Sequence, residues 1–216
     1  MAEKIFDITP QISEKLAVFP GDQSFQRNVV MAFVKGDHLD LSNVTTTVHL
    51  GAHADAPSHY HSQGKTIDQR PLGLYMGLAQ VIRVSGLKAG ERIQRHHISS
   101  PLRAPRVLFY TGSFPDPQNW RSDFNSLSPD LIEALADQGV KLVGIDTPSV
   151  DPETSKDLEA HQILFKRDMA VLEGLVLEQV PEGLYTLLAL PLPIVGGDAS
   201  PVRAVLLPAI DHFPEV

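Results

Sequence analysis

Short apolar runs, separated by glycine and proline, dominate the hydrophobic pattern of this chain. Runs rich in Val, Ile, Leu and Thr that stop at turn-forming residues are typical of strands. Such runs outnumber the segments with helical features by a wide margin, so the sequence predicts more strands than helices. The strands are expected at residues 5–9, 25–34, 41–48, 78–84, 106–111, 140–146, 171–177, 184–192 and 203–210.

Helices are predicted at two places only. Ser128 is a good N-cap, Pro129 fits the first helical position, and Leu131 and Leu135 form an inner stripe that ends before Gly139. The apolar strand 140–146 follows at once, which indicates strand–helix–strand α/β architecture. A second helix is expected over 157–166. We therefore predict one α/β domain spanning residues 1–216, with a strand-rich mixed sheet and few helices.

Composition narrows the possible partners and the available metal ligands. A formal net charge of -8 argues against non-specific nucleic-acid binding, which requires a basic face. The sequence has no Cys, so a transition-metal site would need His, Asp and Glu ligands. The first seven residues lack a secretory pattern, and the apolar segment 184–195 is too short to span a membrane. We expect a cytoplasmic protein without a nucleic-acid or membrane partner.

The run 48–61 concentrates four histidines and one aspartate between glycine and proline. On an extended strand His49 and His53 would lie about 13 Å apart, which is too far for one ion. On a helix Asp55 would point about 240° away from His49, and Gly51 disfavours a helix. The sequence therefore predicts a strand ending near His49, a turn at Gly51, and a loop that returns His53 and Asp55 towards it.

His49, His53 and Asp55 are candidate metal ligands, because imidazole and carboxylate suit zinc and related ions. His59, placed just beyond them, is the candidate proton-transfer group. The alternative is a histidine-rich loop whose rings bind their own backbone. His38 is expected in a solvated turn, and His96 and His97 lie in a polar stretch, where no metal role is expected.

His161 and Glu173 are the remaining candidate ligands. On one unbroken helix they would be about 18 Å apart, so a shared site requires the helix to end between them. The sequence permits a break near residues 167–168, after which the chain can return as a strand.

Residues 49–59 match the pattern H-x-G-[TA]-H-x-D-x-P-x-H and so resemble the signature of the metal-dependent cyclase family of hydrolases. Further segments resemble the bacterial kynurenine formamidase branch of that family, and the resemblance covers nearly the full chain. These segments are 145–152, 160–161, 172–175 and 198–204.

The resemblance implies a cyclase-like fold of the swivelling β/β/α type, a homodimer, and two divalent ions, usually zinc. His49, His53 and Asp55 would hold the first ion and His161 the second, with Asp55 and Glu173 bridging. Manganese or cobalt would accept the same ligands. The resemblance also implies that His59 is the general acid/base. Phe19 matches a substrate-contacting position that is commonly Trp in the family.

The implied reaction is hydrolysis of N-formyl-L-kynurenine to L-kynurenine and formate. A related hydrolase acting on another small aromatic or cyclic amide, such as isatin, would use the same centre. A serine nucleophile is disfavoured because the sequence lacks a G-x-S-x-G motif. A metal-binding domain without turnover, and a structural domain that binds no metal, are the non-enzymatic alternatives.

Overall fold

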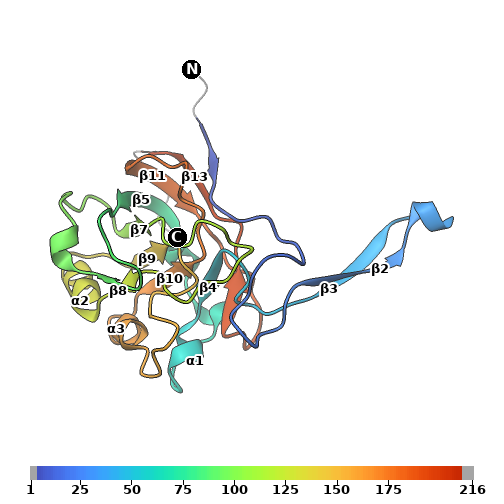
Figure 1. The fold of residues 1–216 in the computed structure, drawn as a ribbon, viewed down its shortest axis with the longest axis horizontal. Helices are drawn as coiled ribbons and strands as arrows, with labels where there is room; N and C mark the ends of the chain where they lie inside the picture. The colour runs from blue at the N-terminus through green and yellow to red at the C-terminus, as the bar shows by residue number, and fades with distance from the viewer. Residues whose placement is uncertain (1–3, 211–216) are drawn as a thin grey trace.

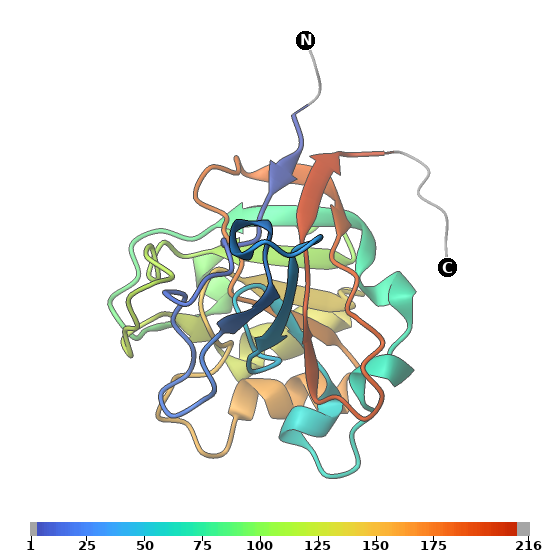
Figure 2. The ribbon, with the colours of Figure 1, turned by 90° about the vertical axis from the view of Figure 1, so that its right-hand side faces the viewer.

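A curled mixed sheet of nine strands organises the computed structural model, which describes residues 4–210 (Figure 1). Its four central strands, β5, β7, β9 and β10, run parallel, and the flanking strands pair antiparallel (Figure 2). In spatial order the strands are β1 (Phe6–Asp7), β13 (Val205–Pro208), β11 (Gly183–Leu188), β5 (Met76–Arg83), β7 (Arg106–Tyr110), β9 (Leu142–Ile145), β10 (Ala170–Glu173), β4 (His53–Asp55) and β12 (Ala199–Pro201).

Two small sheets, three α-helices and four short 3-10 turns complete the described part of the chain. The helices are α1 (Pro57–Tyr60), α2 (Pro129–Asp137) and α3 (Glu159–Lys166). One small sheet joins β6 (Arg92–Ile93) to β8 (Ser126–Leu127). The other joins β2 (Gln26–Met31) to β3 (Leu41–Thr45) in a hairpin that projects from the body (Figure 1). No helix within residues 4–210 is long and apolar enough to cross a membrane.

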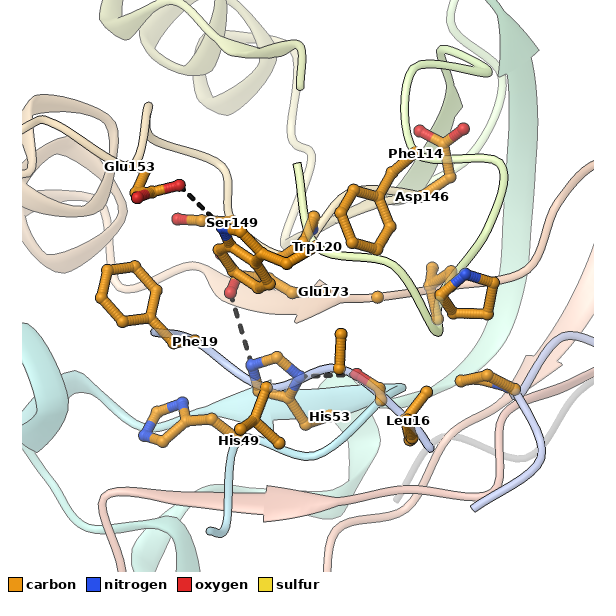
Figure 3. Close-up of a pocket in the computed structure, with 18 of the residues that line it drawn as sticks. Leu16, Phe19, His49, His53, Phe114, Trp120, Asp146, Ser149, Glu153 and Glu173 are labelled. Carbon is orange, nitrogen blue, oxygen red and sulfur yellow. Dashed lines mark hydrogen bonds and ion pairs between the residues drawn. The ribbon is translucent and has the colours of Figure 1, made fainter. Parts of the chain in front are cut away.

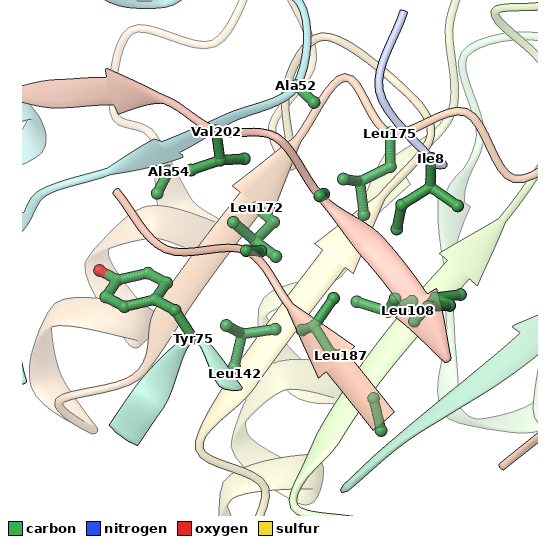
Figure 4. Packing of buried hydrophobic residues seen from close by; sticks show 14 of the residues in the cluster. Ile8, Ala52, Ala54, Tyr75, Leu108, Leu142, Leu172, Leu175, Leu187 and Val202 are labelled. Atoms are coloured by element: carbon green, nitrogen blue, oxygen red, sulfur yellow. The ribbon is translucent and has the colours of Figure 1, made fainter. Parts of the chain in front are cut away.

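The central strands β7, β9 and β10 are buried along almost their whole length. Along β7, Val107 and Phe109 pack with α2 and α3, whereas Leu108 between them faces the opposite cluster. That second cluster fills the inside of the curled sheet, and Figure 4 shows Leu108, Leu142, Leu172 and Leu187 converging there. One sheet thus supplies a wall to two hydrophobic cores, which confirms the strand-rich α/β prediction.

Helix α2 begins and ends where its caps predict. The Ser128 hydroxyl accepts a hydrogen bond from Leu131 N at 3.2 Å, Pro129 occupies the first position, and Gly139 adopts a φ of +82° after the last turn. Leu131 and Leu135 are buried, as predicted. The local signals were sufficient here because both caps act within a few residues of the helix.

Several boundaries differ from the prediction. His53–Asp55, expected in a loop, form strand β4, because their backbone pairs with β10 on one side and β12 on the other. The predicted strand 171–177 ends at Glu173, since Gly174 turns the chain with a φ of +65°. Residues 1–3 and 211–216 of the predicted domain lie outside the described residues.

Candidate metal centre

Strand β4 places His53 and Asp55 on the same face of the sheet, because side chains two residues apart on a strand point the same way. The register of the antiparallel neighbour β10 sets Glu173 opposite His53. His53 Nε2 lies 3.4 Å from both Asp55 Oδ1 and Glu173 Oε2. A strand pair therefore positions three of the predicted ligands.

His161 reaches the same point from α3, which ends at Lys166 before β10 begins at Ala170. Its Nε2 lies 3.4 Å from Asp55 Oδ2 and 3.4 Å from Glu173 Oε1. The helix thus ends before the strand begins, as the sequence permits. His161 and Glu173, from the second half of the chain, therefore meet Asp55 at one point.

His49 precedes the turn at Gly51 and approaches from the other side of Asp55. Its Nδ1 lies 2.9 Å from Asp55 Oδ1, and its Nε2 contacts Asp198 Oδ2 at 3.0 Å. His59, on α1, has its ring 4.2 Å from that of His49 and its Nδ1 3.4 Å from the same Asp198 oxygen. All six predicted ligands and acid/base groups are therefore neighbours.

The possible ligand atoms form two overlapping groups that share Asp55. Nitrogen and oxygen atoms of His49, Asp55 and His59 lie within 4.8 Å of one another, and so do those of His53, Asp55 and Glu173. Asp55 belongs to both groups, as a bridging carboxylate would. His49 and His53 also approach the same oxygen, Asp55 Oδ1, at 2.9 and 3.4 Å.

Unpartnered atoms at the centre fit a bound cation. Asp55 Oδ1 and His161 Nε2 are buried and make no hydrogen bond within residues 4–210, although several groups approach them. A buried polar atom left without a partner costs about 1–3 kcal/mol. Nitrogen and oxygen atoms that converge without bonding one another are arranged as ligands around an ion, so the residues fit a divalent metal.

The electrostatics of the cluster also favour positive charge. Burial would lower the pKa of His53, but the carboxylates of Asp55 and Glu173 raise it to about 10. Burial likewise opposes charge on His161, and Asp151, Asp55 and Glu173 nevertheless raise its pKa well above the usual value. Two buried carboxylates thus attract protons onto adjacent rings, and a metal ion would satisfy the same charge.

Hydrogen bonds from outside the cluster hold the imidazole rings. His53 Nδ1 bonds the Gly51 carbonyl at 2.8 Å, and His161 Nδ1 bonds Asp151 Oδ2 at 2.9 Å. Each bond leaves Nε2 directed inward, an arrangement that fixes ring orientation in metal sites. Asp151 was not predicted from its chemistry, although it lies in the segment 145–152 that carried the resemblance.

Gly174 links the two halves of the centre. A Cβ at this position would lie 2.1 Å from the Gly51 carbonyl oxygen, which itself orients His53, and the φ of +65° disfavours any other residue. We expect Gly174→Ala to lower the free energy of unfolding by about 3 kcal/mol and to reduce metal content.

Gly86→Ala is the matched control, because Gly86 has a φ of +81° and no atom would lie within 4 Å of a Cβ added there. Its expected loss is only the backbone strain, about 1 kcal/mol. Equal destabilisation in the two variants, measured by denaturant unfolding, would show that the contact with Gly51 is unimportant.

A cavity of about 560 Å³ opens onto the cluster. Phe19 lies on its wall, and Trp120 packs edge-to-face against it with ring centroids 5.5 Å apart (Figure 3). Trp120 belongs to the segment 112–125, which the sequence indicates only as irregular. Its role was missed because nothing in the local sequence relates it to Phe19, about a hundred residues away.

The other histidines within residues 4–210 do not line the cavity. His96 and His97 lie in a 3-10 turn at Arg95–His97, and neither lines the cavity. His61 stacks on Phe165 with ring centroids 3.6 Å apart. Of the histidines in the described chain, only those at 49, 53, 59 and 161 line the cavity.

The family model named Cyclase matches residues 6–152 of this chain. The chain belongs to the cyclase family. Kynurenine formamidases of Bordetella petrii and Delftia acidovorans are 40% and 41% identical to it, over 94% and 95% of this chain and 98% of each relative. The resemblance inferred from the histidine motif is confirmed.

Solved structures agree with this membership of the cyclase family. A potential metal-dependent hydrolase with cyclase activity has a TM-score of 0.83 at 28% identity and covers 99% of this chain and 100% of its own. Isatin hydrolase A from Labrenzia aggregata has the same fold, with a TM-score of 0.79 at 23% identity over 96% of this chain and 94% of its own. The predicted cyclase-like fold is confirmed.

Proposed function

We propose that this cyclase-family protein is an arylformamidase that hydrolyses N-formyl-L-kynurenine to L-kynurenine and formate. The observation that carries the proposal is the convergence of His53, His161, Asp55 and Glu173 at 3.4 Å at the base of a cavity with aromatic walls. The formamidase relatives at 40–41% identity support the substrate.

The proposed cofactor is a pair of divalent ions, zinc in the first place, with manganese or cobalt as the alternatives. His49, His53 and Asp55 are proposed for one ion and His161 for the other, with Asp55 and Glu173 shared. When bound, such ions lower the pKa of water towards neutrality and polarise the formyl oxygen.

His59 is proposed to move the proton that amide hydrolysis requires, accepting it from water and delivering it to the departing aniline nitrogen. The ring is partly exposed to the cavity, and its Nδ1 lies 3.4 Å from Asp198 Oδ2. That carboxylate can hold the Nδ1–H tautomer, which leaves Nε2 free for proton transfer. Phe19 and Trp120 supply apolar faces against which an aryl ring can pack.

The decisive assay measures hydrolysis of N-formyl-L-kynurenine with and without a chelator, with isatin as a second substrate. We expect chelator-sensitive release of L-kynurenine. Activity on isatin alone would reassign the enzyme to that branch. Bound metal without turnover of either compound would indicate a metal-binding domain that is not an enzyme. If elemental analysis of untagged protein finds no metal, the remaining alternative is a structural domain.

The hairpin formed by β2 and β3 is the proposed contact between two copies of this chain. It stands clear of the body (Figure 1) and exposes apolar side chains along its length, and exposed apolar patches mark interaction surfaces. These include Val30, Phe33, Val34, Leu41 and Val44, which are exposed by 49–95% of their area. A second copy is the proposed partner, which makes the protein a homodimer.

We expect Val34→Asp to convert the dimer to a monomer in sedimentation experiments, because a desolvated charge at this site would oppose association. Val195→Asp is the control, since Val195 is 89% exposed but lies outside the hairpin. A wild-type protein that sediments as a monomer would contradict the proposal.

The cytoplasmic location stays a prediction, testable by cell fractionation.

A further inference from the structure

Glu153 lines the same cavity as the metal centre but takes no part in the chemistry proposed above. Its Oε2 accepts a hydrogen bond from Trp120 Nε1 at 2.8 Å, which fixes the carboxylate beside the aromatic pair. In the view of Figure 3, Glu153 lies across Trp120 from His53. Within residues 4–210, the bond from Trp120 is the only hydrogen bond or ion pair of this carboxylate, so the second oxygen, Oε1, has no protein partner.

The surroundings of Glu153 match the chemistry of an ammonium group. The Glu153 carboxylate, at the edge of the Trp120 indole, is a charge-assisted hydrogen-bond acceptor. The neighbouring rings of Phe19 and Trp120 add aromatic surface, whose faces attract cations. No Lys or Arg occurs among the described residues that line the cavity. A cationic ligand would therefore meet no competing side chain.

We propose that Glu153 binds the α-ammonium group of an amino-acid substrate and so selects a zwitterionic aryl formamide. The inference rests on the proposed function, in which the aryl ring packs against Phe19 and Trp120. With the formamide directed to the metal centre, the amino-acid tail extends towards the outer side of Trp120. The substrate carboxylate, which finds no cation among the described lining residues, stays in water at the cavity mouth.

An ammonium contact at Glu153 would discriminate between N-formyl-L-kynurenine and isatin as substrates. Isatin carries no ammonium group, so a carboxylate at this position offers it nothing. N-formyl-L-kynurenine gains one charge-assisted hydrogen bond, which at a half-buried site corresponds to about a tenfold change in affinity. Glu153 is accordingly a specificity-determining residue.

The test compares Glu153→Gln with wild type on two substrates. One is N-formyl-L-kynurenine, and the other is 2-formamidoacetophenone, which keeps the aryl formamide and the ketone but lacks the amino-acid tail. Glutamine can still accept the bond from Trp120 Nε1, so the ring stays in place. We expect KM for N-formyl-L-kynurenine to rise about tenfold, with kcat/KM for the shorter compound unchanged.

Glu14→Gln is the matched control, because Glu14 is an exposed carboxylate that does not line the cavity. It should leave both substrates unaffected. Equal losses on both compounds in Glu153→Gln would overturn the proposal, since Glu153 would then act only by holding Trp120. An unchanged KM for N-formyl-L-kynurenine would also overturn it. Wild-type protein inactive on both would overturn the proposed function, and the ammonium site with it.

A binding measurement separates recognition from turnover. Trp120 is the only Trp of the chain, so its fluorescence reports directly on this part of the cavity. L-kynurenine should quench it at lower concentration in wild type than in Glu153→Gln, by about tenfold. Identical titration curves for the two proteins would contradict an ammonium contact at Glu153.

Discussion

Replacing His59 with alanine is expected to lower kcat for N-formyl-L-kynurenine about a thousandfold, within the range attributed to a general acid/base, while metal content stays at the wild-type level. The imidazole is partly exposed, bonds no backbone group, and meets only Asp198 and neighbouring rings. Its removal should therefore leave the fold intact. Steady-state kinetics and elemental analysis of the same preparation measure both quantities.

His61→Ala is the control for this substitution. His61 lies two residues along, stacks on Phe165, and is not among the residues lining the cavity. Full activity in His59→Ala would exclude the acid/base role. Loss of metal in His59→Ala would instead show that His59 is a metal ligand. This is the main competing assignment, because possible ligand atoms of His59, His49 and Asp55 lie within 4.8 Å of one another.

Asp55→Asn is expected to abolish both metal binding and hydrolysis. Asp55 is 2% exposed, and its two oxygens are approached by three histidine rings, at 2.9 Å for His49 and 3.4 Å for His53 and His161. Asparagine has the same shape but offers one oxygen and no charge, so it would be a much weaker ligand for the proposed ions. We expect kcat/KM to fall at least a thousandfold, about 4 kcal/mol of transition-state stabilisation.

Elemental analysis and kinetics with added zinc test this expectation. Asp130→Asn, an exposed aspartate in the first turn of α2, controls for the loss of one negative charge. Wild-type metal content in Asp55→Asn would show that Asp55 is no essential ligand. Metal loss with retained hydrolysis would refute the proposed metal-dependent reaction altogether.

Sequence patterns found the elements that local interactions determine. The caps of α2 act within a few residues, and the apolar run 140–146 requires burial on both faces wherever it lies. The motif at residues 49–59 likewise presents its chemistry within eleven consecutive positions. Its spacing predicts a loop at His53 and Asp55, whereas these residues form β4, because that strand depends on partners more than a hundred residues away.

The sequence by itself determined the strand-rich α/β class, the histidine and carboxylate chemistry, and the requirement that the chain break between His161 and Glu173. Only the tertiary structure decided that Glu173 faces His53 across two paired strands, that Asp151 orients His161, and that Trp120 joins Phe19 in one cavity wall. The reason is physical: residue types and local spacing set which groups are available, whereas strand register and loop packing set which of them meet.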